Sequence, residues 1–248
     1  MQDMGMTHAF FISDLHIGEP EPDNAAQKQE IILSFLKNVA LNGTHLFIVG
    51  DLFDFWYEYK WVIPKKHFPY LHQLRLLVEA GVEVHYLAGN HDFYLGEFFK
   101  KYIGIQTWPD EYEFELAGKK FFLYHGDGVA KRDKGYRFMK KIFRNPVSIW
   151  FYRWIHPDWG IPFARFVSGS SRKYTNQIDM RDEPDYIAFA EKQFERGVDY
   201  VLMGHRHNPL KHKKDGRIYI NLGDWIEKFT YAEFDGKELE LKQYEQTV

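Results

Sequence analysis

Five short apolar runs, each followed at once by a polar cluster, constrain the fold of this chain more than any other feature. Short runs without polar alternation indicate strands that are buried on both faces. The clusters that follow are Ser13-Asp14-Leu15-His16, Gly50-Asp51-Leu52-Phe53-Asp54, Gly89-Asn90-His91-Asp92, His125-Gly126-Asp127 and Gly204-His205-Arg206-His207. Open α/β sheets bind ligands at the carboxyl ends of their strands. We therefore predict an α/β fold in which five strand ends deliver Asp, His and Asn side chains to one rim.

Strand and helix patterns alternate along most of the chain. Apolar residues recur at helical spacing in segments 25–42 and 70–80, and Gly43 and Gly81 are suited to end these helices. We also predict helices at 93–102 and 182–196, and a loop on the rim at 56–69. The predicted strands are 9–12, 45–49, 82–87, 112–116, 119–124, 198–203, 217–221, 230–234 and 239–244.

The length and composition of the chain limit its domain count and its chemistry. A chain of 248 residues is long enough for one large α/β domain, and we predict a single domain over residues 1–248. The net charge of −3 gives no general reason to expect nucleic acid as a partner. The absence of cysteine excludes disulfides, zinc–thiolate sites and a cysteine nucleophile.

The N-terminal segment gives no indication of export. Met1 to His8 lacks a basic region followed by a long apolar region, so we expect no signal peptide. No apolar run approaches the roughly 20 residues that a membrane-spanning helix needs. We therefore expect a cytoplasmic protein, and contact with a membrane surface remains open.

Residues 134–173 differ in composition from the rest of the chain. Basic and aromatic side chains are interleaved there, and Asp158 is the only acid. Because the segment interrupts the alternation of strands and helices, we predict a mostly helical insertion, the cap, over the rim at about residues 134–180. Its cations could clamp phosphate, and its rings could line an acyl channel or rest on a bilayer surface. Alternatively, the rings form the core of the insertion and its basic face is solvated.

The side chains expected at the rim are those that a pair of divalent metal ions requires. Two such ions need a bridging anion and mixed oxygen and nitrogen ligands. Asp51 can bridge because each of its two oxygens can face one ion, and Asn90 adds a neutral amide oxygen. Any one of the histidines alone would more often be a surface or hydrogen-bonded core residue. Five clusters in succession, each after a buried strand, favour two ions with Asp51 between them.

These clusters resemble the five signature blocks of the calcineurin-like metallophosphoesterases, and the match spans most of the chain. The blocks are Asp14-x-His16, Gly50-Asp51-x-x-Asp54, Gly89-Asn90-His91-Asp92, His125-Gly126-Asp127 and Gly204-His205-x-His207. The resemblance implies a four-layer αββα sandwich with a dinuclear manganese, iron or zinc centre. It also implies that one ion takes Asp14, His16, Asp51 and His207, and that the other takes Asp51, Asn90, His125 and His205.

The resemblance further implies hydrolysis of a phosphoester. Two bound ions would hold phosphate oxygens and lower the pKa of the water molecule that attacks phosphorus. His91 would face the phosphate, as a proton donor to the leaving group or as a group that stabilises charge, or it would only donate a hydrogen bond behind the ligands. Asp92 could orient His91 or be a structural, buried carboxylate. Asp54 and Asp127 could likewise support histidine ligands or be structural.

A closer resemblance concerns the UDP-2,3-diacylglucosamine hydrolases of lipid A synthesis. It rests on Gly50 to Trp56, on Gly89 to Phe93, and on His125-Gly126-Asp127 followed by Asp133-x-x-Tyr136. The resemblance implies manganese-dependent cleavage of UDP-2,3-diacylglucosamine to UMP and 2,3-diacylglucosamine 1-phosphate at the cytoplasmic face of the inner membrane. The implied substrate contacts are Asn90, His91, Asp133, Tyr136, Arg172, Lys173 and His205.

The sequence leaves other functions open. Some of these hydrolases carry Arg directly after the ligand Asn, whereas this chain carries His91, as general phosphoesterases do. A metal-dependent phosphodiesterase, phosphatase or nuclease is therefore the alternative, with the basic cap as the only feature that favours nucleic acid. A scaffold that binds a partner through the aromatic cap is a third hypothesis, and the presence of all seven predicted ligands argues against it.

Overall fold

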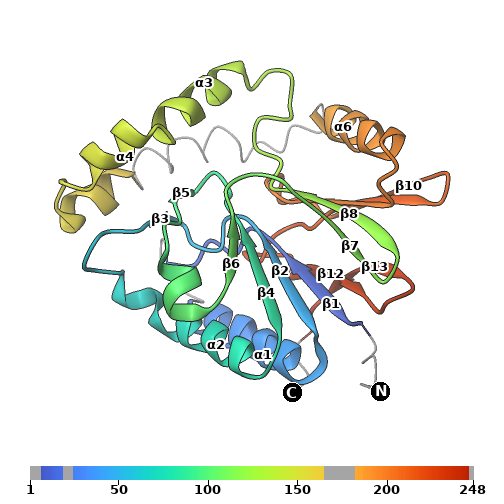
Figure 1. The fold of residues 1–248 in the computed structure, drawn as a ribbon, viewed down its shortest axis with the longest axis horizontal. Coiled ribbons are helices and arrows are strands. Elements are labelled where there is room, and N and C mark those ends of the chain that lie inside the picture. Colours follow the sequence, from blue (N-terminus) through green and yellow to red (C-terminus); the bar gives the residue numbers. More distant parts are fainter. Residues whose placement is uncertain (1–6, 19–24, 165–181, 246–248) are drawn as a thin grey trace.

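Two mixed β-sheets lie face to face, and helices cover the outer face of each (Figure 1). The computed structural model describes residues 7–18, 25–164 and 182–245. Helices α1 (Ala25–Asn42) and α2 (Phe68–Glu79) pack on the first sheet, and α6 (Glu183–Glu195) packs on the second. This arrangement confirms the four-layer αββα sandwich.

The first sheet has six strands in the order β13-β12-β1-β2-β4-β6. Four of these strands are parallel, namely β1 (Ala9–Ile12), β2 (His45–Val49), β4 (Glu83–Leu87) and β6 (Gln106–Trp108). The other two form an antiparallel edge, namely β12 (Thr230–Phe234) and β13 (Leu239–Gln243). Because β1, β2 and β4 are parallel neighbours, the polar clusters that follow them lie at one edge of the sheet.

The second sheet has five strands in the order β10-β11-β9-β8-β7. Its central strands are parallel, namely β8 (Lys119–Tyr124), β9 (Tyr200–Met203) and β11 (Arg217–Asn221). Antiparallel strands form both edges, namely β7 (Tyr112–Leu116) and β10 (Leu210–Lys214). The polar clusters after β8 and β9 therefore share an edge as well. A small third sheet pairs β3 (Trp56–Tyr57) with β5 (Asp92–Tyr94).

The strands are apolar throughout because both faces of each sheet are covered. In β1, Phe10 packs toward α1 and α2, whereas Phe11 packs toward the second sheet. Between the sheets, the ring of Phe11 stacks on those of Phe47 and Phe121, with centroid distances of 4.8 and 5.6 Å. This aromatic layer fixes the position of one sheet against the other, and with it the position of their polar edges.

Most predicted elements are confirmed, and two segments differ from the prediction. Segment 56–69 is not simply a loop, because it contains β3, a 3₁₀ helix at Lys65–His67 and the start of α2. Helix α2 begins before Pro69 because proline is favoured in the first turn of a helix. Segment 93–102 is helical only at its end, where a π-helix spans Phe99–Ile103, because β5 occupies its start.

The sequence predicts neither of two edge strands, β6 and β10. Strand β6 has only three residues, which is too short for a periodic signal. Strand β10 reads Leu-Lys-His-Lys-Lys, and its lysines are typical of an exposed sheet edge that must not pair with another chain. No helix in the described part of the chain combines the length and the apolar character needed to cross a membrane.

The described residues of the cap are largely helical. Helices α3 (Lys134–Phe143) and α4 (Pro146–Tyr152) lie at one end of the molecule, apart from both large sheets (Figure 1), and residues 157–164 are helical as well. The side chain of Asn145 accepts a hydrogen bond of 2.8 Å from the Val147 amide, which explains where α4 begins. Residues 165–181, the rest of the predicted insertion, lie outside the described part of the chain.

Aromatic side chains attach the cap to the small third sheet. The hydroxyl of Tyr57 donates a hydrogen bond of 2.6 Å to the carbonyl of Ile149 in α4. The ring of Phe143 lies 5.5 Å from that of Phe93 in β5. Part of the aromatic content thus forms a core for the cap, while other rings are exposed, namely Phe151, Trp154, Trp159 and Phe163.

Candidate metal centre

Five of the seven predicted metal ligands have a left-handed backbone conformation. Their φ angles are 56° for Asp14, 45° for His16, 54° for Asp51, 70° for His205 and 52° for His207. Residues other than glycine rarely adopt this conformation, and such strain concentrates at functional sites. The chain turns sharply at these points, so residues two apart, such as His205 and His207, leave the extended path of the strand.

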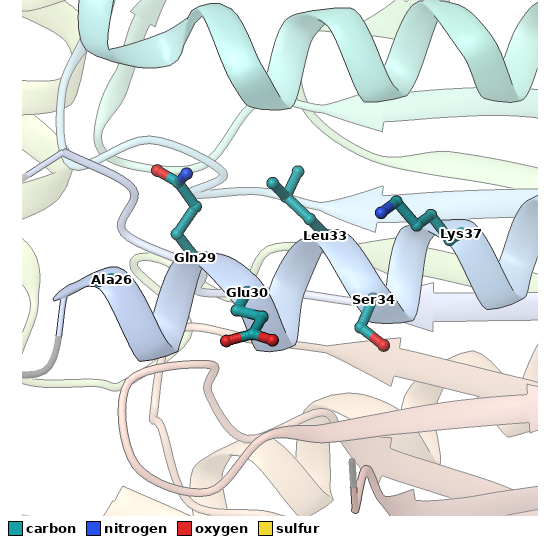
Figure 2. A pocket seen from close by; sticks show the side chains of 6 residues that line it. All are labelled: Ala26, Gln29, Glu30, Leu33, Ser34 and Lys37. Atoms are coloured by element: carbon teal, nitrogen blue, oxygen red, sulfur yellow. The ribbon is translucent and has the colours of Figure 1, made fainter. Parts of the chain in front are cut away.

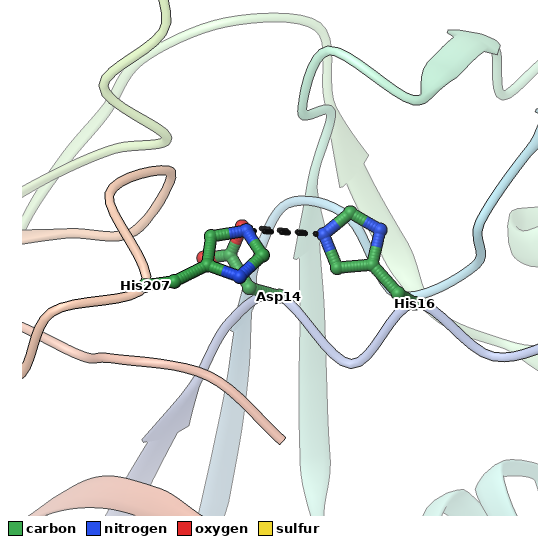
Figure 3. Close-up of side chains that lie close together, drawn as sticks. All are labelled: Asp14, His16 and His207. Carbon is green, nitrogen blue, oxygen red and sulfur yellow. Dashed lines mark hydrogen bonds and ion pairs between the residues drawn. The ribbon is translucent and has the colours of Figure 1, made fainter. Parts of the chain in front are cut away.

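Asp14, His16 and His207, the first cluster, bring together three atoms that can bind a metal. Oδ1 of Asp14 lies 3.3 Å from Nε2 of His207 and 3.7 Å from Nε2 of His16. The two imidazole rings stack, with 3.3 Å between their Nε2 atoms (Figure 3). One carboxylate oxygen and two ring nitrogens thus converge at separations that a single divalent ion could span.

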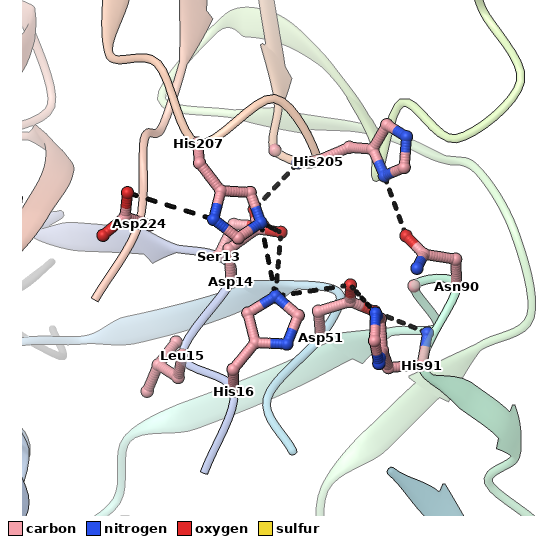
Figure 4. Close-up of polar contacts among 12 residues, drawn as sticks. Ser13, Asp14, Leu15, His16, Asp51, Asn90, His91, His205, His207 and Asp224 are labelled. Atoms are coloured by element: carbon pink, nitrogen blue, oxygen red, sulfur yellow. Dashed lines mark hydrogen bonds and ion pairs between the residues drawn. The ribbon is translucent and has the colours of Figure 1, made fainter. Parts of the chain in front are cut away.

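Asn90, His125 and His205 form the second cluster. Oδ1 of Asn90 lies 2.9 Å from Nε2 of His125. The same oxygen lies 2.8 Å from Nδ1 of His205 (Figure 4). On its other side, Nδ1 of His125 lies 2.9 Å from the carbonyl oxygen of Val49. With a proton on Nδ1 for that hydrogen bond, His125 turns the lone pair of Nε2 toward the cluster, as a metal ligand requires.

Asp51 lies between the two clusters. Its Oδ2 is 3.7 Å from Nε2 of His16 and 3.3 Å from Nε2 of His125. Its Oδ1 accepts a hydrogen bond of 2.8 Å from the backbone amide of His91. Oδ2 thus faces both clusters, whereas Oδ1 is held by the loop that follows β4. Only glycine fits at position 89, because a Cβ there would lie 2.2 Å from Oδ1 of Asp51.

The donor set of the two clusters suits divalent cations. Carboxylate oxygens, an amide oxygen and imidazole nitrogens are ligands for manganese, iron and zinc. Oδ1 of Asp14 is buried and has no hydrogen-bond donor among the described residues, which is costly unless a cation satisfies it. Asn90, His205 and His207 are only partly buried, so the site is open to a substrate on that side.

The buried acids and histidines of the clusters shift one another's pKa values. Burial alone would lower the pKa of His125, but the carboxylates of Asp51 and Asp14 outweigh it and raise that pKa to about 10. Burial is likewise outweighed at His16, where Asp14 and Asp54 raise the pKa to about 9. Burial would raise the pKa of Asp51, yet the nearby histidines hold it well below its usual range. The protonated rings of His16 and His125 thus balance the negative charge of the carboxylates. Bound metal ions would supply this positive charge instead.

His91 faces the clusters from the side of the third sheet. Its Nδ1 lies 2.6 Å from the carbonyl oxygen of Asp54, and its Nε2 lies 3.9 Å from Oδ2 of Asp51. Its ring meets that of His16 edge to face, with 4.7 Å between the centroids. Burial lowers the pKa of His91, so the ring is neutral near pH 7 and its Nδ1 proton is donated to Asp54.

Asp92 binds backbone amides and a tyrosine hydroxyl rather than the ring of His91. Its Oδ2 accepts hydrogen bonds of 2.9 Å from the backbone amides of Asp51 and Gly89. The hydroxyl of Tyr86 donates to its Oδ1. Burial, together with the charge of Asp51, raises the pKa of Asp92 to about 6. Asp92 thus links the loop after β2 to the loop after β4, which fits the structural reading of this residue.

The two other acids of the signature blocks have different surroundings. Oδ1 of Asp54 lies 3.7 Å from Nδ1 of His16, so this carboxylate supports a histidine of the first cluster. Oδ2 of Asp127 lies 2.8 Å from Nζ of Lys140, a residue of the cap. Asp127 therefore contacts the cap.

The predicted substrate-binding residues are only partly described. Asn90, His91 and His205 lie at the clusters. Asp133 precedes α3, and burial, with the charge of Asp182, raises its pKa. Tyr136 lies in α3, but its side chain is outside the described part of the structure, and Arg172 and Lys173 are outside it entirely.

Asp224 joins the site although the sequence analysis does not name it. Its Oδ2 lies 3.9 Å from Nδ1 of His207 (Figure 4), and its Oδ1 accepts backbone hydrogen bonds from Ile226 and Glu227. Strand β11 is a sixth apolar run followed by a polar cluster, Asn221-Leu222-Gly223-Asp224. The pattern that identifies the other five clusters could therefore have identified this one.

Two hollows differ in their relation to the clusters. One of about 310 Å³ lies between the cap and β5, and its lining includes Asp92, Phe93, Trp108, Arg144 and Ile149. The other, of about 350 Å³, lies along the outer helix α1 (Figure 2), and its lining is Ala26, Gln29, Glu30, Leu33, Ser34 and Lys37. Of these two hollows among the described residues, the one at the cap borders the candidate site.

Comparison with known proteins points to the same chemistry. The model of the calcineurin-like phosphoesterase family matches residues 8–209, more than half of the chain. A UDP-2,3-diacylglucosamine hydrolase of Porphyromonas gingivalis is 32% identical, with 95% of this chain and 97% of that protein aligned. One of Pseudomonas putida is 31% identical over 94% of this chain and 98% of that protein. The solved structure of an archaeal phosphodiesterase, 15% identical with a TM-score of 0.51 over 95% of this chain and 99% of that one, shares the fold.

Proposed function

Because the chain belongs to the calcineurin-like phosphoesterase family, we propose that it hydrolyses the pyrophosphate of UDP-2,3-diacylglucosamine to UMP and 2,3-diacylglucosamine 1-phosphate. The chain is an enzyme, a phosphoester hydrolase, and relatives named for this substrate align with nearly its whole length. The observation that carries the proposal is the position of Asp51, whose Oδ2 faces both clusters of potential metal ligands.

The rim residues fit two divalent metal ions. We assign one ion to Asp51 with the first cluster and the other to Asp51 with the second cluster. Manganese is the metal we propose, and the same donors would accept iron or zinc. Two ions bound there would neutralise the charge of the phosphate and lower the pKa of a water molecule for attack on phosphorus.

His91 would contact the phosphate directly. The hydrogen bond from its Nδ1 to the carbonyl of Asp54 fixes the ring, so that Nε2 faces the clusters. A phosphate near Nε2 would favour the protonated ring, which would then donate a proton to the leaving oxygen or stabilise negative charge on the phosphate. Asp92 would act less directly, by holding the backbones of Asp51 and Gly89.

The cap would bind the sugar and acyl parts of the substrate. Asp133, Tyr136, Arg172 and Lys173, together with His205, are the residues we propose at the sugar phosphate. The hollow of about 310 Å³ between the cap and β5 offers apolar surface from Phe93 and Ile149, which suits an acyl chain.

Exposed rings on the cap would rest on the membrane that holds a diacyl substrate. The side chains of Phe151, Trp154 and Trp159 are exposed, at 62, 73 and 77% of their full surface. Aromatic rings next to basic side chains favour the interface of an anionic bilayer. We therefore place the enzyme peripherally at the cytoplasmic face of the inner membrane.

Release of UMP from UDP-2,3-diacylglucosamine tests the proposed function. With manganese, the purified protein should release UMP, and the Asp51→Asn variant should release none above background. A panel of p-nitrophenyl esters and nucleotides, each with manganese, magnesium and zinc, provides the comparison. Hydrolysis of these esters without UMP release would reject the substrate and retain the chemistry.

A phosphodiesterase of other specificity is the second candidate. The observation in its favour is His91, because some UDP-2,3-diacylglucosamine hydrolases carry Arg at this position whereas general phosphoesterases carry His. The same panel decides between the two, since such an enzyme would prefer a simple diester to the lipid-linked substrate. A nuclease is disfavoured because cap cations that could hold a nucleic-acid backbone contact protein groups instead, namely Arg137, Lys140 and Arg144.

A further inference from the structure

Three basic residues of the cap, two in helix α3 and one directly after its C-terminal end, contact the loops that carry the second cluster. Arg137, Lys140 and Arg144 are three and four residues apart, a spacing that places side chains on one face of a helix. The composition of the cap predicts cations that clamp phosphate. These three instead bind carbonyl and carboxylate groups of the loops after β4 and β8, which suggests that they hold those loops in place.

Lys140 holds the loop that follows β8. Its Nζ lies 2.8 Å from Oδ2 of Asp127 and 3.1 Å from Oδ1 of Asp110. Asp127 is buried and comes two residues after His125, a member of the second cluster. An ion pair that is buried at one end is costly to break, because the buried carboxylate then loses the partner that balances much of its charge.

Arg144 holds the loop that follows β4. Its guanidinium donates hydrogen bonds of 2.8 Å to the carbonyl oxygens of Gly89 and Pro109. Gly89 directly precedes Asn90, and its Cα packs so closely on Asp51 that a Cβ would overlap Oδ1. A shift of this loop would therefore move Asn90, a member of the second cluster.

The contacts of the cap are confined to one side of the site. Arg137 donates hydrogen bonds to the carbonyl oxygens of Gly128 and Ala130, which also follow His125. Within the described ranges, no hydrogen bond or ion pair joins residues 134–164 to Asp14, His16 or His207. The cap thus holds the loops that carry the second cluster and makes no such contact with the first cluster.

We propose that Lys140 and Arg144 are positioning residues for the ion at the second cluster, and that docking of the cap and binding of this ion are coupled. The inference rests on the two-ion site of the proposed function. Each cation fixes one of two ligand loops from the cap side, so both loops reach their positions only when α3 is docked. Because such coupling is reciprocal, binding of the second ion also stabilises the docked cap.

Stepwise manganese titration of the metal-free, full-length protein, followed by electron paramagnetic resonance, tests the coupling. The variants are Lys140→Met and Arg144→Met, with Lys141→Met as the matched control on an exposed neighbouring lysine. We expect the second manganese ion to bind about 10–100-fold more weakly in the two variants, as for other groups that orient metal ligands, and the first ion to bind unchanged. The signal of a spin-coupled manganese pair appears only when both ions are bound to one chain. In these variants it should therefore require manganese in excess of two ions per chain, and in the control it should not.

A charge-retaining variant separates positioning from a folding defect. Lys140→Arg keeps a cation beside Asp127 and should recover most of the affinity for the second ion. In the wild type, hydrogen exchange in residues 134–152 should slow when the second ion binds, and this protection should be weaker in Lys140→Met. Equal affinity for the second ion in all variants, or an equal loss at both sites, would overturn the inference. The titration needs no lipid, so a failure to release UMP would reject the proposed substrate without affecting this result.

Discussion

Oδ2 of Asp51 lies 3.3 Å from Nε2 of His125, although the two residues follow strands of different sheets. Asp51 follows β2 in the first sheet, and His125 follows β8 in the second. The contact therefore exists only because the aromatic layer around Phe11 holds the two sheets at a fixed offset. The candidate metal centre depends in this way on the whole core of the sandwich.

Replacement of Asp51 by asparagine should abolish hydrolysis and reduce bound metal. Asparagine has nearly the same shape, but it lacks the charge that would hold two cations together. We expect elemental analysis to find about two manganese ions per chain in the wild type and fewer in Asp51→Asn. Asp158→Asn, at an exposed acid of the cap, should bind as much metal as the wild type. Full metal content in Asp51→Asn would contradict the bridging role.

Metal binding should release protons. The pKa values of about 9 for His16 and about 10 for His125 mean that both rings are protonated at pH 7.5 in the metal-free protein. Each ring must lose one proton to bind metal, so these two residues should release about two protons, and the affinity should rise by about 100-fold per pH unit below pH 9. Calorimetry in buffers of different protonation enthalpy measures this number, and a value near zero would contradict the assignment of both rings as ligands.

Replacement of His91 by glutamine should slow catalysis while the metals stay bound. A group that transfers a proton or stabilises charge in the transition state contributes about 10²-fold or more to the rate. We therefore expect kcat to fall by about 10²-fold in His91→Gln with unchanged manganese content. The exposed cap histidine provides the control, since His156→Gln should keep its kcat. Loss of metal with loss of activity would instead make His91 a support for the ligands.

Replacement of Tyr86 by phenylalanine should weaken both folding and metal binding. The variant leaves Oδ1 of Asp92 buried without its donor, and the free energy of unfolding should fall by about 1–3 kcal/mol. Because Asp92 holds the backbones of Asp51 and Gly89, manganese affinity should fall by about tenfold or more. Urea denaturation and manganese titration measure the two effects.

Tyr200→Phe is the matched control for that variant. Tyr200 is buried between Phe121 and Phe234, and no hydrogen bond of its hydroxyl is described. Removal of this hydroxyl should leave manganese affinity unchanged. If both tyrosine variants lose metal equally, the link from Tyr86 through Asp92 is not the cause.

Removal of exposed rings from the cap should weaken binding to anionic vesicles. Burial of a large apolar side chain is worth about 1.5–3 kcal/mol, so the double change Phe151→Ser and Trp154→Ser should lower the partition coefficient by about 10²- to 10⁴-fold. Co-sedimentation with vesicles that contain phosphatidylglycerol measures the coefficient. Leu41→Ser, at an exposed apolar residue of α1, should have no effect. Equal binding of all variants would exclude the cap as the membrane contact.

The strands and the residues at their ends could be predicted because their signal is local. A buried strand is a short apolar run, and a functional side chain directly after it breaks that run, as Asp51 does after β2. Helix α1 was equally predictable, since Ile32, Phe35, Leu36 and Val39 recur at helical spacing on its buried face.

The remaining features depend on contacts between distant segments. Strand β5 forms only by pairing with β3, so residues 93–102 carry no strand signal of their own. The sequence left open whether Asp92 orients His91 or is structural, and only the tertiary structure shows that the Nδ1 atom of His91 lies beside the carbonyl oxygen of Asp54. The partners of Lys140 and Arg144 follow from where α3 docks, which the composition of the cap does not specify.

A crystal grown with manganese, with anomalous scattering recorded at the manganese edge, tests the central claim most directly. The account predicts two peaks, one among Asp14, His16 and His207 and one among Asn90, His125 and His205, with Oδ2 of Asp51 between them. A map with no peak at these side chains, or with a single peak that Asp51 does not contact, would contradict it.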